Sequence, residues 1–387
     1  LYTNGRDKNS RNTLLLLVNN QQAIPPSEMV KEAFQRYADV FSYSANTSIL
    51  TLQAEAEASA RKLTGCQEKA FTFHFILHYP NVTAIIVAAL LENQNAFQGR
   101  NHLLVPSCEQ QFIINALCRR QNLGTTYDWV TSKNGRVKES DLAEALSPRT
   151  LLFSISAANG MTGFLEAIPE LAALCKERGV IFHIDLSDIL GRCALPAELY
   201  QADILTFSSQ SLGGIGPSGA MFISPALTKY FSLWLPSNPQ VPTCLSSLAA
   251  FSLACQERTT AFSSLVLSAI SSRAALKQAL SAIPQVEFLL EDSAPRLPNV
   301  AVFAIPGIPA ESLGFFLSQK NIFVGLGYER FQPLSQILQS SGISPFLCHS
   351  ALHVSFTERT PTTHFSALAT ALQEGISHLQ PLVTQSL

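Results

Sequence analysis

Charged residues are scarce in this chain. Asp, Glu, Lys and Arg make up 14% of its 387 residues, and the formal net charge is -2. No run of Lys and Arg occurs, so neither nucleic acid nor an anionic membrane surface is expected as a partner. No apolar run approaches the roughly 20 residues that cross a bilayer, so no membrane span is predicted. Internal repeats and low-complexity stretches are also missing, while the 47% hydrophobic content suffices for a large core.

The eight cysteines do not form a recognisable binding pattern, because no C-x-x-C pair occurs among them. In a chain of this length, cysteines without such a pattern favour a reduced, cytoplasmic protein over one held together by disulfides. No His/Cys pair has ligand spacing on the chain, and no metal site is expected. His74 and His78 stand four residues apart, which suits a metal on a helix, but no third ligand accompanies them, and structural histidines are the favoured interpretation.

Short apolar runs alternate with helical patterns through the first two thirds of the chain. Strands are predicted at 14–18, 102–105, 151–156, 180–184, 204–208 and 220–223, and helices at 27–37, 52–63, 110–120 and 168–178. Ser27 is the expected N-cap of the first helix. Apolar strands that alternate with helices predict an α/β fold with a mainly parallel, doubly covered sheet.

The pattern changes after about residue 255. A long helix is predicted over 259–283, followed by strands at 286–290, 300–305, 322–324 and 352–356 and helices at 310–319 and 361–379. We therefore expect an N-terminal arm over 1–13, a large α/β domain over 14–255 and a small α+β domain over 256–387.

Two segments indicate a family. Phe182-His183-Ile184-Asp185 has the form of a strand that ends in an acid, and Thr206-Phe207-Ser208-Ser209-Gln210-Ser211 leads into a glycine-rich loop. Together they resemble the pyridoxal-phosphate (PLP) enzymes of aminotransferase class V, the NifS-like cysteine desulfurases in particular. The resemblance covers about residues 14–379 and implies PLP-dependent transferase fold type I with a seven-stranded sheet. It implies a Schiff-base lysine where this chain has Ser211, whose hydroxyl cannot form an imine.

Other family positions also differ. The phosphate loop aligns with Phe71–Leu77, where His74, Phe75 and Ile76 replace its small and hydroxylated residues. Gln110 stands where the resemblance implies a ring-stacking histidine, and an amide is no general acid or base. His353 stands at the substrate-carboxylate arginine, and the loop over 325–330, which would carry the persulfide cysteine, has no cysteine.

A relic of the cofactor pocket is expected around the positions that remain. Asn159 and Ser208 match family residues, and Asp185 matches the acid that pairs with the pyridine nitrogen; Asp188 stands where glutamine is usual, and Gln210 where histidine is usual. Asp185 either still binds a cationic ring or is a buried acid satisfied by backbone donors, and we favour the second. Lys176 and Lys229 are not expected to replace the missing lysine, and the string from Gly213 to Gly219 precedes a strand, so it is no dinucleotide fingerprint.

The sequence thus predicts a catalytically inactive homologue of the cysteine desulfurases that binds no PLP and acts through protein contacts. Its expected partners are a second copy, an intact homologue or a sulfur-transfer protein. The alternative is an enzyme with altered chemistry in the same pocket, using Asp185, Asp188 and His183 without a Schiff base.

Overall fold

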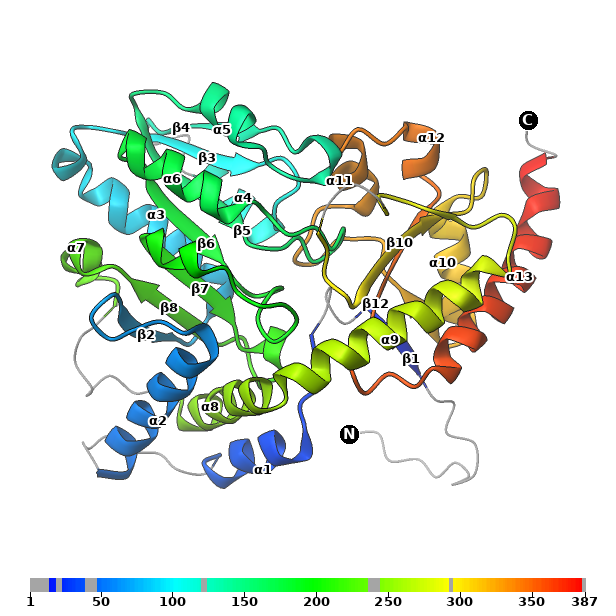
Figure 1. Cartoon of the computed structure of the whole chain (residues 1–387), viewed down its shortest axis with the longest axis horizontal. Helices are drawn as coiled ribbons and strands as arrows, with labels where there is room; N and C mark the ends of the chain where they lie inside the picture. The colour runs from blue at the N-terminus through cyan, green and yellow to red at the C-terminus, as the bar shows by residue number, and fades with distance from the viewer. Residues whose placement is uncertain are drawn as a thin grey trace.

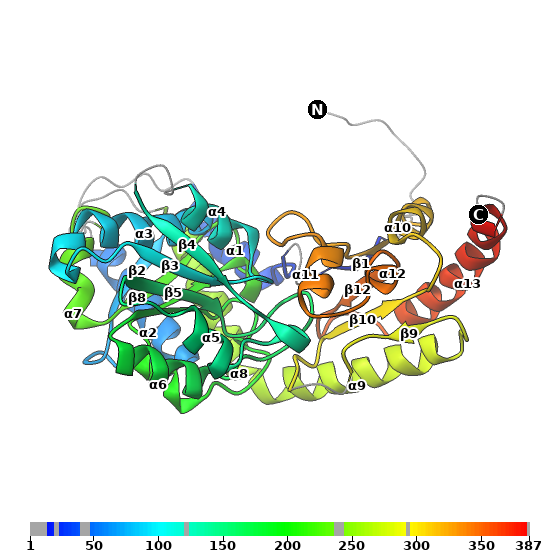
Figure 2. The same ribbon diagram turned by 90° about the horizontal axis from the view of Figure 1, so that it is seen from above.

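The computed structural model describes residues 14–18, 23–38, 47–119, 124–235, 244–291 and 295–384. The described residues form a seven-stranded sheet in the first two thirds of the sequence, a three-stranded sheet near the C-terminus and a two-stranded pair (Figure 1). The long helix α9 (Phe262–Ser281) runs from the seven-stranded sheet to the three-stranded one, as the view from above also shows (Figure 2).

The larger sheet has seven strands in the order β2-β8-β7-β6-β5-β3-β4. Neighbours are parallel except that β8 runs antiparallel to both β2 and β7. The strands are β2 (Thr72–Ile76), β3 (His102–Pro106), β4 (Thr126–Val130), β5 (Thr150–Ser156), β6 (Ile181–Asp185), β7 (Ile204–Ser208) and β8 (Gly219–Ile223). The predicted mainly parallel, seven-stranded sheet is confirmed.

Helices cover both faces of this sheet, as near-continuous apolar strands require. One core lies under α2 (Thr47–Thr64), α5 (Glu139–Ala145), α6 (Ile168–Arg178) and α8 (Leu245–Thr260). The other lies under α3 (Val82–Glu92), α4 (Gln111–Cys118) and α7 (Pro225–Thr228). Short 3-10 turns are η1 (Tyr79–Asn81), η2 (Gln94–Phe97), η4 (Lys133–Gly135), η5 (Ala197–Gln201), η6 (Gln210–Leu212) and η7 (Lys229–Phe231).

Helix α1 (Glu28–Arg36) begins where the sequence predicts it. The Ser27 side chain accepts a hydrogen bond from the Val30 backbone N–H at 3.1 Å, which satisfies one of the free donors of the first turn. The same hydroxyl donates to Oε1 of Glu257 on α8 at 2.6 Å. The cap therefore also ties α1 to the long helices.

The smaller sheet has the order β12-β10-β9, all antiparallel: β12 (Ala351–Ser355), β10 (Val300–Ala304) and β9 (Glu287–Phe288). Its core includes residues of α9, α10 (Ala310–Gln319) and α13 (Thr363–Thr384). Nearby are α11 (Leu334–Ser340) and α12 (Pro345–Cys348). Strand β1 (Leu15–Leu17) pairs in parallel with β11 (Ile322–Val324), so the N-terminal strand contacts the predicted small domain. The domain limits themselves stay a prediction.

The long helix predicted over 259–283 is present as α9, but it begins at Phe262, because residues 259 and 260 belong to α8. The backbone leaves helical geometry at Ala261 (φ -93°, ψ 5°), and the segment belongs to two helices, α8 and α9. Within the residues that the structure describes, no helix combines the length and apolar character that a bilayer crossing needs.

Candidate functional site

Three strands of the large sheet end in polar residues at one edge. Ser156, Asp185 and Ser208 are the last residues of β5, β6 and β7, which run parallel. Ligand sites of open α/β sheets form at this carboxyl edge. Oδ1 of Asp185 accepts from the Ser187 backbone N–H at 2.8 Å, and the Ser187 hydroxyl accepts from the Ser208 backbone N–H at 2.9 Å. Asp185 and Ser208 are thus joined through one residue.

A tyrosine fills the space beside Asp185. Tyr79 comes from η1, between β2 and α3, and is 3% exposed. Its hydroxyl donates to Oδ2 of Asp185 and lies 3.0 Å from Oγ1 of Thr206. The Ser187 hydroxyl donates to it at 3.3 Å, and its ring packs edge-on against Phe112 at 5.9 Å between centroids. Both oxygens of Asp185 therefore have partners from within the chain.

Burial and this contact change the ionisation of both groups. Burial, together with the neighbouring Asp185 carboxylate, raises the pKa of Tyr79 well above its ordinary value, so the phenol stays protonated and acts as donor. Burial also raises the pKa of Asp185, while the hydrogen bonds from Tyr79 and Ser187 oppose that rise. The phenol, rather than a positive charge, is what Asp185 contacts here.

His183 is held inside the sheet rather than facing a pocket. Its Nδ1 lies 2.7 Å from the Ser154 hydroxyl and its Nε2 lies 2.9 Å from the Thr206 hydroxyl. The ring is fully buried, and burial lowers its pKa to about 3. A neutral imidazole with both nitrogens engaged serves as a bridge between strands and has no free nitrogen for proton transfer.

Ser211 uses its side chain to close a backbone turn. It lies in η6 directly after β7, and its hydroxyl donates to the Ser208 carbonyl at 2.7 Å. Its own carbonyl accepts from Arg192 at 3.3 Å. The neighbouring Gln210 is half-buried, and its carbonyl accepts from the Ile24 backbone N–H at 3.1 Å. The loop therefore keeps a defined shape without a lysine.

Asp188 is paired with a residue from the other part of the chain. Its fully buried carboxylate accepts through Oδ1 from Arg330, which lies in the loop between β11 and α11. Three further hydrogen bonds fix that loop. Gln332 donates to the carbonyls of Ser107 and Glu109 at 2.9 and 3.1 Å, and the Arg330 carbonyl accepts from the Gln111 backbone N–H at 2.7 Å. This loop includes residues 325–330, which contain no cysteine, and it covers the polar edge of the large sheet.

Gln110 and its neighbour turn toward β5. The Gln110 amide donates to the Ser156 hydroxyl at 2.9 Å, and that hydroxyl donates to Glu109 at 2.6 Å. Glu109 also accepts from the Ser156 backbone at 2.7 Å. Burial raises the pKa of Glu109 to about 7 and that of nearby Glu166 to about 8. Gln110 is therefore a structural link between α4 and the sheet.

Asn159 and His353 also have structural surroundings. The Asn159 side chain donates to the Cys108 carbonyl at 2.9 Å and accepts from the backbone of Met161 and Thr162 at 3.0 and 2.9 Å, which shapes a tight turn. His353 is fully buried on β12, and burial lowers its pKa to about 3, opposed by the neighbouring Gly160 backbone. A neutral ring cannot replace the charge of an arginine.

The predicted position of the phosphate loop is wrong. His74, Phe75 and Ile76 lie within β2, which pairs with β8, and do not form a loop at a helix start. Phe75 packs on Phe251 at 5.3 Å between ring centroids, while Ile76 joins the core of the opposite face. The physical reason is that aromatic and β-branched side chains, which make up this segment, favour an extended strand. Residues 77–81 make the turn into α3 instead.

Sequence reasoning missed Tyr79 and Arg330. A signal for Tyr79 existed: Pro80 marks the start of a helical turn, which places the preceding residue at the carboxyl edge of the sheet. Arg330 is separated from Asp188 by 142 residues, and no local pattern connects them.

The structure does not bring together the two histidines considered as metal ligands, and it leaves the two other lysines away from the site. His74 is on a strand and His78 in an exposed turn, so they share no helix face. Over the described ranges, no group of three His, Cys, Asp or Glu side chains could hold a metal. Lys176 and Lys229 are exposed on α6 and η7.

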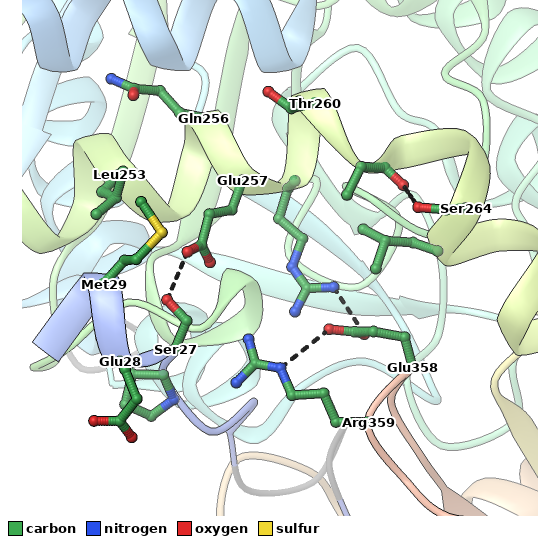
Figure 3. A pocket seen from close by; sticks show the side chains of 14 residues that line it. Ser27, Glu28, Met29, Leu253, Gln256, Glu257, Thr260, Ser264, Glu358 and Arg359 are labelled. Carbon is green, nitrogen blue, oxygen red and sulfur yellow. Dashed lines mark hydrogen bonds and ion pairs between the residues drawn. The ribbon is translucent and has the colours of Figure 1, made fainter.

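A cavity of about 820 Å³ lies between α1, the junction of α8 and α9, and the turn after β12 (Figure 3). Ser27, Glu257, Glu358 and Arg359 are among its lining residues, with Glu358 pairing to Arg258 at 3.2 Å. Arg258 in turn donates to the Leu212 carbonyl at 3.0 Å. The cavity therefore adjoins the loop of Ser211 rather than the Asp185 carboxylate.

The sequence is similar to those of known proteins. The profile described as "Aminotransferase class-V" matches residues 75–241. A cysteine desulfurase of Sinorhizobium fredii is 24% identical over 347 residues, covering 85% of this chain and 87% of that protein. The chain is thus similar to the class-V aminotransferases and to the cysteine desulfurases among them. With the cysteine desulfurase IscS of Buchnera aphidicola, the 24% identity extends over only 32% of this chain and 31% of the relative.

Solved structures confirm the predicted PLP-dependent transferase fold type I. A NifS-like protein superposes with a TM-score of 0.82 at 16% identity, over 95% of this chain and 100% of the other. The NifS-like protein from Rickettsia africae gives 0.79 at 19% identity, over 94% and 100%.

Proposed function

We propose that this chain is a catalytically inactive member of the class-V family that acts through protein contacts. The observation that carries the proposal is the hydrogen bond from Tyr79 to Asp185. Asp185 is the residue that the resemblance assigns to the pyridine nitrogen of PLP, and its oxygens are taken by Tyr79 and the Ser187 backbone. The chain's own phenol is thus bound to the carboxylate that would hold the cofactor ring.

Three further features do not fit PLP. Ser211 has no amine, and its hydroxyl is bound to the Ser208 carbonyl. The turn that would hold phosphate contains Pro80, which has no backbone N–H to donate. Gln110 is bound along β5, where it cannot stack on a ring.

An enzyme with altered chemistry in the same pocket is less well supported. It would need Asp185, Asp188 or His183 to bind substrate or move a proton. All three are fully buried, and the first two carboxylates are bound by Tyr79 and Arg330. His183 is neutral with both nitrogens bonded.

The test is a PLP titration of the purified protein. We expect no absorbance of a protein-bound Schiff base, no PLP-lysine adduct after borohydride reduction and mass spectrometry, and no sulfide released from cysteine. An adduct on any lysine, or sulfide above the level of a heat-unfolded sample, would overturn the proposal.

Partners follow from the same proposal. We propose a homodimer, or a heterodimer with an intact homologue, because low charge and high apolar content suit a large permanent interface. A sulfur-transfer protein is a further partner, and a cytoplasmic location stays a prediction. Light scattering at micromolar concentration checks the assembly, and a monodisperse monomer with no co-purifying homologue would contradict it.

A further inference from the structure

A second groove, of about 540 Å³, lies beside α9 and away from the Tyr79–Asp185 contact. One wall is a stripe of α9 residues at helical spacing: Val266, Ile270, Arg273, Ala274 and Lys277. The other wall comes from residues 192–194 and from Arg296 and Pro298. Figure 1 shows α9 running from the end of α8 toward the smaller sheet.

The charge of this groove opposes that of the whole chain. Four cations line it, Arg192, Arg273, Lys277 and Arg296, and no acidic side chain does so among the described residues. The chain as a whole has a formal charge of -2. The positive groove is therefore a local arrangement and does not reflect a generally basic surface.

One carboxylate holds three of these cations together. Glu291 accepts from Arg273 and Lys277 at 2.9 Å each and from Arg296 at 3.0 Å. The three cations keep the pKa of Glu291 below its ordinary value although burial opposes this. The carboxylate neutralises one of three charges, and Lys277, at 43% side-chain exposure, keeps donors that face solvent.

Arg192 adds a fourth charge from the opposite wall. It donates to the carbonyls of Ser187, Asp188 and Ser211 at 3.1, 2.9 and 3.3 Å. Burial lowers its pKa to about 10, so the guanidinium is still protonated at neutral pH. Its position ties the groove to the loop of Ser211.

The far end of the stripe is apolar. Ile270 is 54% exposed, Val266 lines the groove, and Leu267 beside them is 68% exposed. The stripe from Val266 to Lys277 spans roughly 16 Å at about 1.5 Å per residue, longer than one small anion needs. An apolar end followed by a cationic end matches a peptide with aliphatic residues followed by carboxylates. No aromatic side chain lines the groove in the described ranges to stack on bases, which argues against single-stranded nucleic acid.

We propose that this groove docks a segment of a partner protein in which leucine-like residues precede a cluster of Asp or Glu. The proposal rests on the function proposed above, because it names the chemistry of the protein contact. The two proposals can fail independently. PLP binding would overturn the proposal that the chain is inactive, whereas a groove that binds no peptide would overturn only the docking proposal.

The experiment measures fluorescence anisotropy of a labelled synthetic peptide with two leucines followed by glutamates, added to the full chain. We expect saturable binding that weakens with salt, and much weaker binding of the matching glutamine and lysine peptides. Arg273→Gln with Lys277→Gln should weaken binding about tenfold, by loss of charge-assisted bonds. Lys320→Gln, which removes a cation paired with Glu374 on another surface, is the matched control and should change nothing.

Two single variants keep the test valid if the double variant unfolds. Ile270→Asp adds a negative charge to a half-exposed position and should weaken binding, while Glu291→Gln removes the competing carboxylate and should strengthen it. Equal binding of the glutamine peptide, preference for a single-stranded oligonucleotide, or a loss no larger than in Lys320→Gln would overturn the proposal.

Discussion

The phenolic hydroxyl of Tyr79 donates to Oδ2 of Asp185, so that the acid implied by the family to hold a pyridine nitrogen holds a tyrosine instead. Tyr79→Phe would leave that oxygen without its donor in a buried site. We expect a loss of about 2 kcal/mol in the free energy of unfolding, the usual cost for a hydrogen bond to a charged group. Urea unfolding measures it.

The matched control for this variant is Tyr328→Phe. The Tyr328 ring is 53% exposed, and losing its hydroxyl should change the free energy of unfolding by less than about 0.5 kcal/mol. Equal effects of the two variants would show that the Tyr79–Asp185 bond contributes nothing specific.

Restoring the lysine alone should not restore cofactor binding. In Ser211→Lys, the new amine lies near Arg192, whose guanidinium donates to the carbonyl of residue 211, and Tyr79 still covers Asp185. We expect no Schiff-base absorbance when PLP is added. Adding Tyr79→Ala removes the phenol but supplies no phosphate donors, so binding should still be weak, because a desolvated phosphate without donors costs several kcal/mol. A borohydride-trapped adduct in Ser211→Lys alone would contradict this account.

Much of the fold follows from local pattern. The predicted limits of α6, α10 and β11 agree with the structure at both ends, because Gly179 ends α6 in a left-handed cap and apolar residues recur at helical spacing. Strand β4 was missed because it is a largely exposed edge strand without a continuous apolar run. The break at Ala261 was missed because no Gly or Pro marks it.

The site was less predictable because its contacts are long-range. The sequence places Asp185 and Ser208 at neighbouring strand ends, since both end apolar runs. It does not indicate that Tyr79 reaches Asp185 across 106 positions, or that Arg330 reaches Asp188 across 142. Those partners depend on strand order and on how the loop after β11 packs.

The Arg330–Asp188 pair should stabilise the covering loop. Arg330→Met would leave a fully buried carboxylate without its cation, and we expect a loss of about 3 kcal/mol in the free energy of unfolding. Adding Asp188→Asn should recover part of that loss, because an amide needs no counter-charge. Arg178→Met, which breaks an exposed pair with Glu177, serves as control and should cost less than about 1 kcal/mol. Additive effects of the first two changes would contradict direct coupling.

Through two buried carboxyl groups, stability should fall as pH rises from about 4.5 to about 8. Burial raises the pKa of Glu109 to about 7 and that of Glu166 to about 8, against ordinary values of 4.5. Above pH 4.5 the unfolded chain loses these protons while the folded chain keeps them, so rising pH favours unfolding until the folded groups ionise as well. The slope for each group approaches about 1.4 kcal/mol per pH unit.

The two buried histidines act at lower pH and in the opposite direction. Their pKa values are about 3 in the folded chain, against an ordinary value of 6.5. The stability that His183 and His353 contribute as neutral rings is therefore lost as pH falls below 6.5. Between pH 6.5 and 8 the carboxyl groups therefore dominate the pH dependence of stability.

Glu166→Gln keeps an oxygen that can accept from the Val137 backbone but has no proton to lose, and its stability should decline less steeply between pH 6.5 and 8. Chemical unfolding at several pH values measures the slope, with exposed Glu144→Gln as control. If Glu166→Gln and Glu144→Gln both kept the parent slope, the buried carboxyl of Glu166 would not be the group that titrates.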